Sequence, residues 1–260
     1  MAINGVRKLG DNRFSIYYID NFSDEFKEII RSQLKGVWNG FAQAETIPTY
    51  YSYESTLKSF LDRYNGKDED TRKGMIGELL THMILNHEDN SLRTLSILKN
   101  KEERSIKKGF DVIYHHTVNN NLWYTEVKSG RSATQSSTDY NNVLLKRSKD
   151  GIYAMIQENR ESLWESALID VTQAINLNDG RQLLLELLSQ DAPSQNADQR
   201  KNVILVSSLY HALGDEIALQ SVEDFLNSTI AEGIFLNVIV VSIQKTAFET
   251  VANFLTEEAS

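Results

Sequence analysis

Two acidic residues and a lysine are spaced so that a hairpin would bring them together. Asp111 lies in one short apolar run, and Glu126 and Lys128 end the next run. Three asparagines, at 119–121, separate the runs and predict the turn of a hairpin. Side chains two residues apart share a strand face, so Glu126 and Lys128 point together while Val127 faces the other way. We expect Asp111 to lie beside this pair.

Two carboxylates next to an ammonium group suit a hard cation. Carboxylate oxygens, together with water and substrate phosphate, meet the octahedral preference of Mg²⁺, and Mn²⁺ accepts the same ligands. Such a metal polarises a phosphoryl oxygen and helps to generate hydroxide, while the lysine orients water or balances developing charge. The alternative for the same three residues is a cross-strand salt bridge on a solvated hairpin.

An acidic-x-Lys triplet is not specific by itself, because chance predicts about two of them in a chain of this composition. The sequence holds two, at 25–27 and 126–128. The first lies in a helical pattern, where side chains two residues apart diverge and the charges are solvated. The second ends a strand and precedes the small residues Ser129 and Gly130. Context therefore favours chemistry at 126–128.

Hydrophobic periodicity predicts the elements that must position these side chains. We expect helices over 24–38, 54–64, 71–86, 151–177, 181–189 and 217–230, and strands over 13–19, 92–98, 110–115, 122–127, 203–208 and 235–243. The strand–helix–strand order of 203–243 predicts buried strands of a parallel or mixed sheet. Ser23 offers an N-cap for the first helix, and Asp70 or Thr71 for the third. The segment 129–142, rich in Ser, Thr and Gly, predicts a mobile loop.

The composition excludes several kinds of protein. A hydrophobic fraction of 41% with 24% charged residues is typical of a globular chain. The absence of cysteine excludes disulfides, thiolate metal sites and cysteine nucleophiles. The sequence has neither a G-x-S-x-G nucleophile elbow nor a Walker A phosphate loop, so the chain is not itself an ATPase. It also lacks a signal peptide and a membrane-length apolar run, and we expect a cytoplasmic bacterial protein without membrane contact.

The net charge of −9 is unevenly distributed. Residues 96–149 hold 10 basic and 5 acidic side chains, whereas residues 150–260 hold 5 basic and 17 acidic ones. We call residues 96–149 the basic island, and it contains the predicted hairpin. Within it, Lys107, Lys108 and Arg131 are candidates for contacts with DNA phosphates. A solvated charged loop is the alternative for these three residues.

Three motifs in order resemble the PD-(D/E)xK nuclease superfamily: Gly77-Glu78 on a helix, then Gly109-Phe110-Asp111, then Glu126-Val127-Lys128. Phe110 replaces the proline that usually precedes the aspartate, a departure that removes no ligand. The surrounding sequence, in particular KGMIGELLTH, KKGFDVIY and LWYTEVKSG, is similar to the HamA family of nuclease subunits in Hachiman anti-phage systems. The resemblance covers mainly residues 70–150.

The resemblance implies an α/β fold with a restriction-endonuclease-like core, in which helices flank a mixed central sheet. We expect this nuclease domain over 66–260, and an N-terminal extension over 1–65 that contacts a partner. The resemblance further implies metal-dependent hydrolysis of DNA, with Glu78, Asp111 and Glu126 as ligands of Mg²⁺ or Mn²⁺ and Lys128 as the residue that positions water. It also implies a partner, a superfamily-2 helicase subunit, that restrains and activates the nuclease.

Three alternatives remain open from the sequence. The chain is either a nuclease, a catalytically silent module that binds DNA or a helicase and regulates it, or an interaction protein with a chance salt bridge. Glu78 lies off the apolar stripe of its helix, which fits a ligand in a cleft and a solvent-facing glutamate equally well. His115 and His116 are adjacent on a strand, so they point to opposite faces and cannot ligate one metal together.

Overall fold

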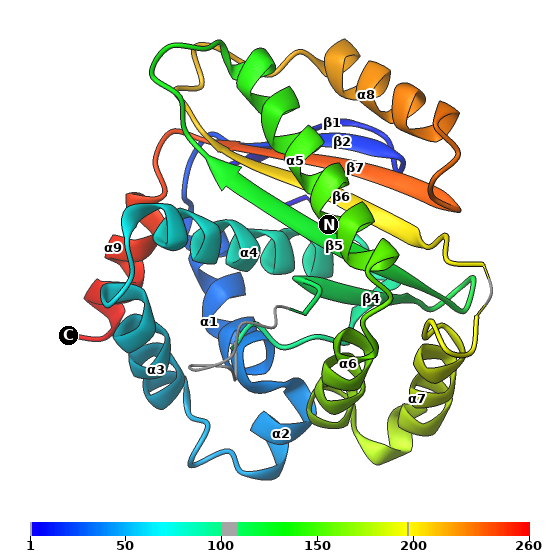
Figure 1. Cartoon of the computed structure of the whole chain (residues 1–260). Helices are drawn as coiled ribbons and strands as arrows, with labels where there is room; N and C mark the ends of the chain where they lie inside the picture. The colour runs from blue at the N-terminus through cyan, green and yellow to red at the C-terminus, as the bar shows by residue number, and fades with distance from the viewer. Residues whose placement is uncertain (1, 100–108, 197) are drawn as a thin grey trace.

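The computed structural model describes residues 2–99, 109–196 and 198–260, and it shows a sheet covered by helices on both faces (Figure 1). Within the described residues the sheet has seven strands in the order β1-β2-β7-β6-β5-β4-β3. The strands are β1 Val6–Gly10, β2 Phe14–Ile19, β3 Leu92–Thr94, β4 Val112–His116, β5 Asn121–Gly130, β6 Asn202–Tyr210 and β7 Asn237–Lys245. The inner strands β2, β7, β6 and β5 run parallel, and the remaining pairings are antiparallel. The expected mixed α/β fold is confirmed.

The helices form two layers, each with its own hydrophobic core. The helices are α1 Asp24–Asn39, α2 Phe41–Thr46, α3 Tyr53–Asn65, α4 Glu69–Glu88, α5 Ser137–Gln157, α6 Glu161–Ala174, α7 Arg181–Gln190, α8 Leu219–Ala231 and α9 Glu249–Glu258. Helices α1, α3, α4 and α9 share a core with one face of the sheet. Helices α5 to α8 share the other core with the opposite face (Figure 1). Helices therefore shield both faces of the sheet from solvent, which explains why the inner strands are almost continuously apolar.

Several sequence expectations are confirmed. Strands β4 and β5 form the predicted hairpin, and β6 and β7 are parallel with α8 between them in the chain. The Oγ of Ser23 accepts a hydrogen bond from the backbone N–H of Phe26, so Ser23 caps α1 as predicted. Val127 belongs to the core on the α4 side, opposite to the face that Glu126 and Lys128 occupy.

The segment 129–142 differs from the predicted loop. Strand β5 continues through Gly130, and α5 already begins at Ser137, capped by Ser136, whose Oγ accepts a hydrogen bond from Asp139 N–H. Serine is common both in loops and at helix N-caps, so composition alone did not separate the two. The predicted long helix over 151–177 is instead the end of α5 and all of α6. Between these two helices Asn159 adopts a φ of 49°, which interrupts the helical conformation.

Smaller differences concern element ends. Helix α4 begins earlier than predicted, at Glu69, and its N-cap is Asp68, whose carboxylate accepts a hydrogen bond from Thr71 N–H. The strand predicted over 92–98 ends at Thr94. Asp111 lies immediately before β4 rather than within it. These shifts of one to a few residues do not change which faces the side chains occupy.

The first 65 residues share the sheet and core with the rest of the chain. Strand β2 pairs with β7 in parallel, and β1 pairs with β2. Phe26 of α1 and Phe60 of α3 are fully buried in the core on the α4 side. Contact between residues 1–65 and a partner stays a prediction. In the three described stretches, every helix is too short or too polar to cross a bilayer.

Candidate active site

The pairing of β4 and β5 places Asp111 beside Glu126. Val112 pairs with Thr125 in the antiparallel register. Asp111, which precedes Val112, and Glu126, which follows Thr125, are therefore neighbours across the hairpin. The Asp111 carboxylate accepts a hydrogen bond from the backbone N–H of Val127 at 2.8 Å. The Lys128 ammonium pairs with the Glu126 carboxylate. The expected proximity of these side chains is therefore confirmed, and we call Asp111, Glu126 and Lys128 the acidic cluster.

Helix α5 closes over the acidic cluster. Glu126 is only 5% exposed. A Cβ built at Gly151 of α5 would lie 3.1 Å from Glu126 Oε1, so the absence of a side chain there leaves room for the carboxylate. One turn earlier, Ser148 Oγ donates a hydrogen bond to the backbone carbonyl of Glu126 at 2.7 Å. Neither Gly151 nor Ser148 was foreseen, although a glycine inside a helical pattern is itself a signal of close packing.

Burial and crowding change the protonation of Glu126. Burial, together with the nearby negative charge of Asp111, raises the pKa of Glu126 to about 8, although Lys128 acts in the opposite direction. Burial lowers the pKa of Lys128, but the charges of its carboxylate neighbours outweigh that effect and leave it raised, so the ammonium stays charged. Glu126 therefore takes up a proton more readily than an exposed glutamate, and an entering cation would compete with that proton.

Helix α4 brings a third carboxylate from the opposite face of β5. A Cβ at Gly77 would lie 1.9 Å from Ser129 Oγ and 3.0 Å from Ser208 Cβ, so only glycine allows α4 to lie this close to β5 and β6. Glu78 follows directly and is partly buried. Its negative charge contributes to the raised pKa of Lys128, which places Glu78 within electrostatic reach of the acidic cluster.

The donor set fits an open metal site rather than a closed cage. Across residues 2–99, 109–196 and 198–260, no three His, Cys, Asp or Glu side chains converge as a formed metal centre. Asp111 and Glu126 nevertheless present adjacent carboxylates whose mutual repulsion raises the pKa of Glu126. One or two carboxylates completed by water and substrate phosphate is a common arrangement for Mg²⁺. The residues present therefore fit Mg²⁺ or Mn²⁺.

Two of the three predicted phosphate contacts, Lys107 and Lys108, lie outside the described residues. Arg131, the third, follows β5 and is half exposed. Its guanidinium pairs with Glu69 Oε1 at 2.5 Å and with Glu249 Oε1 at 3.7 Å. Arg131 thus links the end of β5 to the first turns of α4 and α9, and any contact with DNA would have to compete with two carboxylates. That contact stays a prediction.

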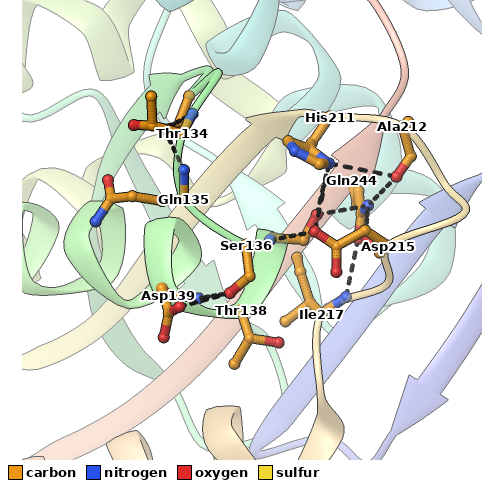
Figure 2. A network of polar contacts seen from close by, with 12 residues as sticks. Thr134, Gln135, Ser136, Thr138, Asp139, His211, Ala212, Asp215, Ile217 and Gln244 are labelled. Carbon is orange, nitrogen blue, oxygen red and sulfur yellow. Dashed lines mark hydrogen bonds and ion pairs between the residues drawn. The ribbon is translucent and has the colours of Figure 1, made fainter.

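A second polar cluster, which sequence patterns did not predict, lies where α5 begins (Figure 2). Ser137 Oγ lies 2.9 Å from His211 Nδ1, and Ser137 N–H donates to Asp215 Oδ2 at 2.7 Å. Gln244 Nε2 donates to the backbone carbonyl of Asp215 at 2.8 Å and to Ser137 Oγ at 3.3 Å. We call these four residues the Ser–His network. Its members come from three distant segments, so no local motif could have revealed it.

The Ser–His network does not have the geometry of a catalytic triad. Asp215 Oδ2, at 3.7 Å, and Ser137 Oγ both approach the same nitrogen of His211, whereas a triad uses the two ring nitrogens separately. Ser137 is also completely buried. The network instead ties the start of α5 to the loop between β6 and α8, and so fixes the helix that covers Glu126.

Comparison with known proteins identifies one family. The HamA family model matches residues 4–258, which is nearly the whole chain. The match extends across strands β1 and β2, both core layers and the acidic cluster. No curated protein matches the chain.

Proposed function

Because this chain belongs to the HamA family, we propose that it is a metal-dependent deoxyribonuclease of a Hachiman anti-phage defence complex. The observation that carries the proposal is the acidic cluster: two crowded carboxylates and a lysine on one face of β5. The raised pKa of Glu126, to about 8, supports it, because crowded carboxylates favour a bound cation. A simple cross-strand salt bridge would need only one carboxylate for one ammonium group.

Asp111 and Glu126, with Glu78, would hold Mg²⁺ or Mn²⁺. The bound ion would supply Lewis-acid polarisation of the phosphoryl oxygen and a water of lowered pKa. Lys128 remains charged and lies beside Glu126, so its ammonium can orient the attacking water and stabilise negative charge that develops on the phosphate. The backbone N–H of Val127 holds Asp111 in place, and α5 excludes solvent from Glu126.

Control by a superfamily-2 helicase subunit is the second part of the proposal. Family membership supports it, since Hachiman systems pair the two subunits. The charge distribution is compatible with it: residues 150–260 hold 17 acidic and only 5 basic side chains, so this part of the chain repels DNA. A helicase that brings DNA to the basic island would overcome that repulsion.

A catalytically silent module that binds DNA or the helicase is the competing function. The ion pairs of Lys128 and Arg131 with acidic neighbours favour it, because they neutralise cations near the cluster. Against it stands the complete set of Asp111, Glu126 and Lys128, since a silenced site commonly lacks one member.

Cleavage of plasmid DNA separates these functions. We would incubate the full chain with and without a candidate superfamily-2 helicase subunit, in Mg²⁺, Mn²⁺ or EDTA. Lys128→Ala is the test variant. Lys27→Ala, from the other acidic-x-Lys triplet, is the matched control because Lys27 forms an ion pair with Asp24 on the surface of α1. The proposal expects metal-dependent cleavage by wild type and Lys27→Ala, and its loss in Lys128→Ala. Equal cleavage by both variants, or DNA binding without cleavage under every condition, would contradict it.

A further inference from the structure

Helix α5 carries three cations, Lys146, Arg147 and Lys149, that point in different directions. Successive residues of a helix turn by about 100°, so these side chains leave the helix axis on separate sides. Lys149 Nζ pairs with Glu232 Oε1 at 2.6 Å, just beyond α8. Asn142, two turns before Lys149 on the same side, donates a hydrogen bond to Ser221 Oγ of α8. This flank of α5 therefore faces α8.

The opposite flank of α5 lies over β5 and the acidic cluster. A Cβ built at Gly151, on this flank, would lie 3.1 Å from Glu126 Oε1. Tyr140, also on this flank, packs over Gly130 at the end of β5, where a Cβ would lie 2.9 Å from the tyrosine oxygen. Arg147 is turned by only about 40° from Gly151 and about 20° from Tyr140. Arg147 therefore belongs to the flank that borders the acidic cluster.

Arg147 is also free to bind. Its side chain is exposed, and it forms no hydrogen bond or ion pair with any residue that the structure describes. Two other described cations near the site are engaged: Lys128 by Glu126, and Arg131 by Glu69 and Glu249. An unpaired guanidinium at the border of a site for phosphodiesters has the geometry to hold a phosphate through two parallel hydrogen bonds.

We propose that Arg147 is a substrate-positioning residue that binds a backbone phosphate of the DNA strand entering the acidic cluster. The inference rests on the proposed function and deepens it by naming where the strand is held. A phosphate contact fixes register without reading sequence, so the contribution of Arg147 is the same for all DNA sequences. Lys146 is turned by about 140° from Gly151 and points away from the cluster, although it is equally exposed.

The test compares Arg147→Gln with Lys146→Gln, two variants that remove the same charge from neighbouring surface positions. Binding of a labelled DNA duplex to the full chain is measured by fluorescence anisotropy in EDTA, over a range of salt concentrations. We expect Arg147→Gln to weaken binding several-fold at low salt, and to reduce the slope of log K against log salt by about 0.9, the value for one phosphate contact. Lys146→Gln should leave the slope unchanged. In Mg²⁺, Arg147→Gln should raise KM for DNA more than it lowers kcat.

The outcomes distinguish this inference from the proposed function. Unfolding midpoints of both variants should equal that of wild type, since both side chains are exposed. If wild type cleaves DNA and Arg147→Gln binds and cleaves like Lys146→Gln, the inference is overturned while the nuclease function stands. If wild type never cleaves but Arg147→Gln alone loses DNA affinity and salt dependence, the nuclease function fails and the assignment of Arg147 as a phosphate contact is supported.

Discussion

The acidic cluster, which α5 covers at Gly151, and the Ser–His network, which includes the first residue of α5, satisfy their polar groups in opposite ways. In the network, donors meet acceptors: Gln244 Nε2 donates to Ser137 Oγ and to the Asp215 carbonyl, and Ser137 N–H donates to the Asp215 carboxylate. In the acidic cluster, two carboxylates compete for one ammonium group, and burial raises the pKa of Glu126 to about 8. A satisfied network stabilises structure, whereas a crowded pair of acids has a free-energy cost unless a cation joins it. From this difference we expect the network to stabilise the fold, and we propose the acidic cluster as the place of the chemistry.

The largest expected effect separates the two clusters by activity. Asp111→Asn keeps the shape of the side chain but removes a charge from the acidic cluster, and we expect DNA cleavage to fall by about 10²–10³-fold, the usual loss for one electrostatic group of an active site. The matched variant Asp215→Asn alters the Ser–His network instead and should retain most of the cleavage rate. Initial rates on a linear duplex in Mg²⁺ provide the measurement. Similar rates for the two variants would erase the proposed distinction.

The next largest expected effect is on stability, and it concerns the packing of α4 against β5. In Gly77→Ala the new Cβ must displace Ser129 or Ser208, and we expect a loss of about 1–3 kcal/mol in the free energy of unfolding. Gly74→Ala is the control, because no described atom other than its own helix backbone and chain neighbours lies within 4 Å of a Cβ there. That variant should stabilise α4 by about 0.5–1 kcal/mol. Urea denaturation compares them, and equal changes would mean that α4 does not depend on the close approach at Gly77.

The pH dependence of stability tests the raised pKa of Glu126, which burial and the charge of Asp111 both increase. The folded pKa of Glu126 is raised from 4.5 to about 8, so the folded state binds the extra proton and its stabilising effect is present at low pH. That effect is lost as pH rises between these two values, by up to about 1.4 kcal/mol per pH unit. We expect the unfolding free energy of wild type in EDTA to fall more steeply from pH 6 to 8 than that of Glu126→Gln. Parallel curves would show that folding does not raise the pKa of Glu126.

The smallest effect concerns the Ser–His network. Ser137→Ala removes the hydroxyl that meets His211 and Gln244, and leaves buried partners incompletely bonded. We expect a loss of about 1–2 kcal/mol in unfolding free energy and little change in the cleavage rate of the folded protein. A large fall in kcat at unchanged stability would instead place the network in the reaction.

The contrast between the two clusters also shows which structural features can be predicted from the sequence. The alternation of Glu126, Val127 and Lys128 on a strand is local, so the hairpin and the faces of its side chains were predictable. The roles of Ser137 and Gln244 were not, because 107 positions separate them and only the assembled sheet brings them together. The start of α5 was not predicted, because a serine such as Ser136 is common both in loops and at helix N-caps.

Direct titration with Mn²⁺ tests the central claim, that the acidic cluster is a metal site. Electron paramagnetic resonance counts free Mn²⁺ in solutions of the full chain at pH 7 and pH 8.5, with and without a phosphorothioate-modified DNA duplex that resists cleavage. We predict saturable binding by wild type and Asp215→Asn, tighter at pH 8.5 than at pH 7 because Glu126 must lose its proton, and weakened at least about tenfold in Asp111→Asn. Binding of equal strength by wild type and Asp111→Asn, or none by any form even with DNA present, would contradict the claim.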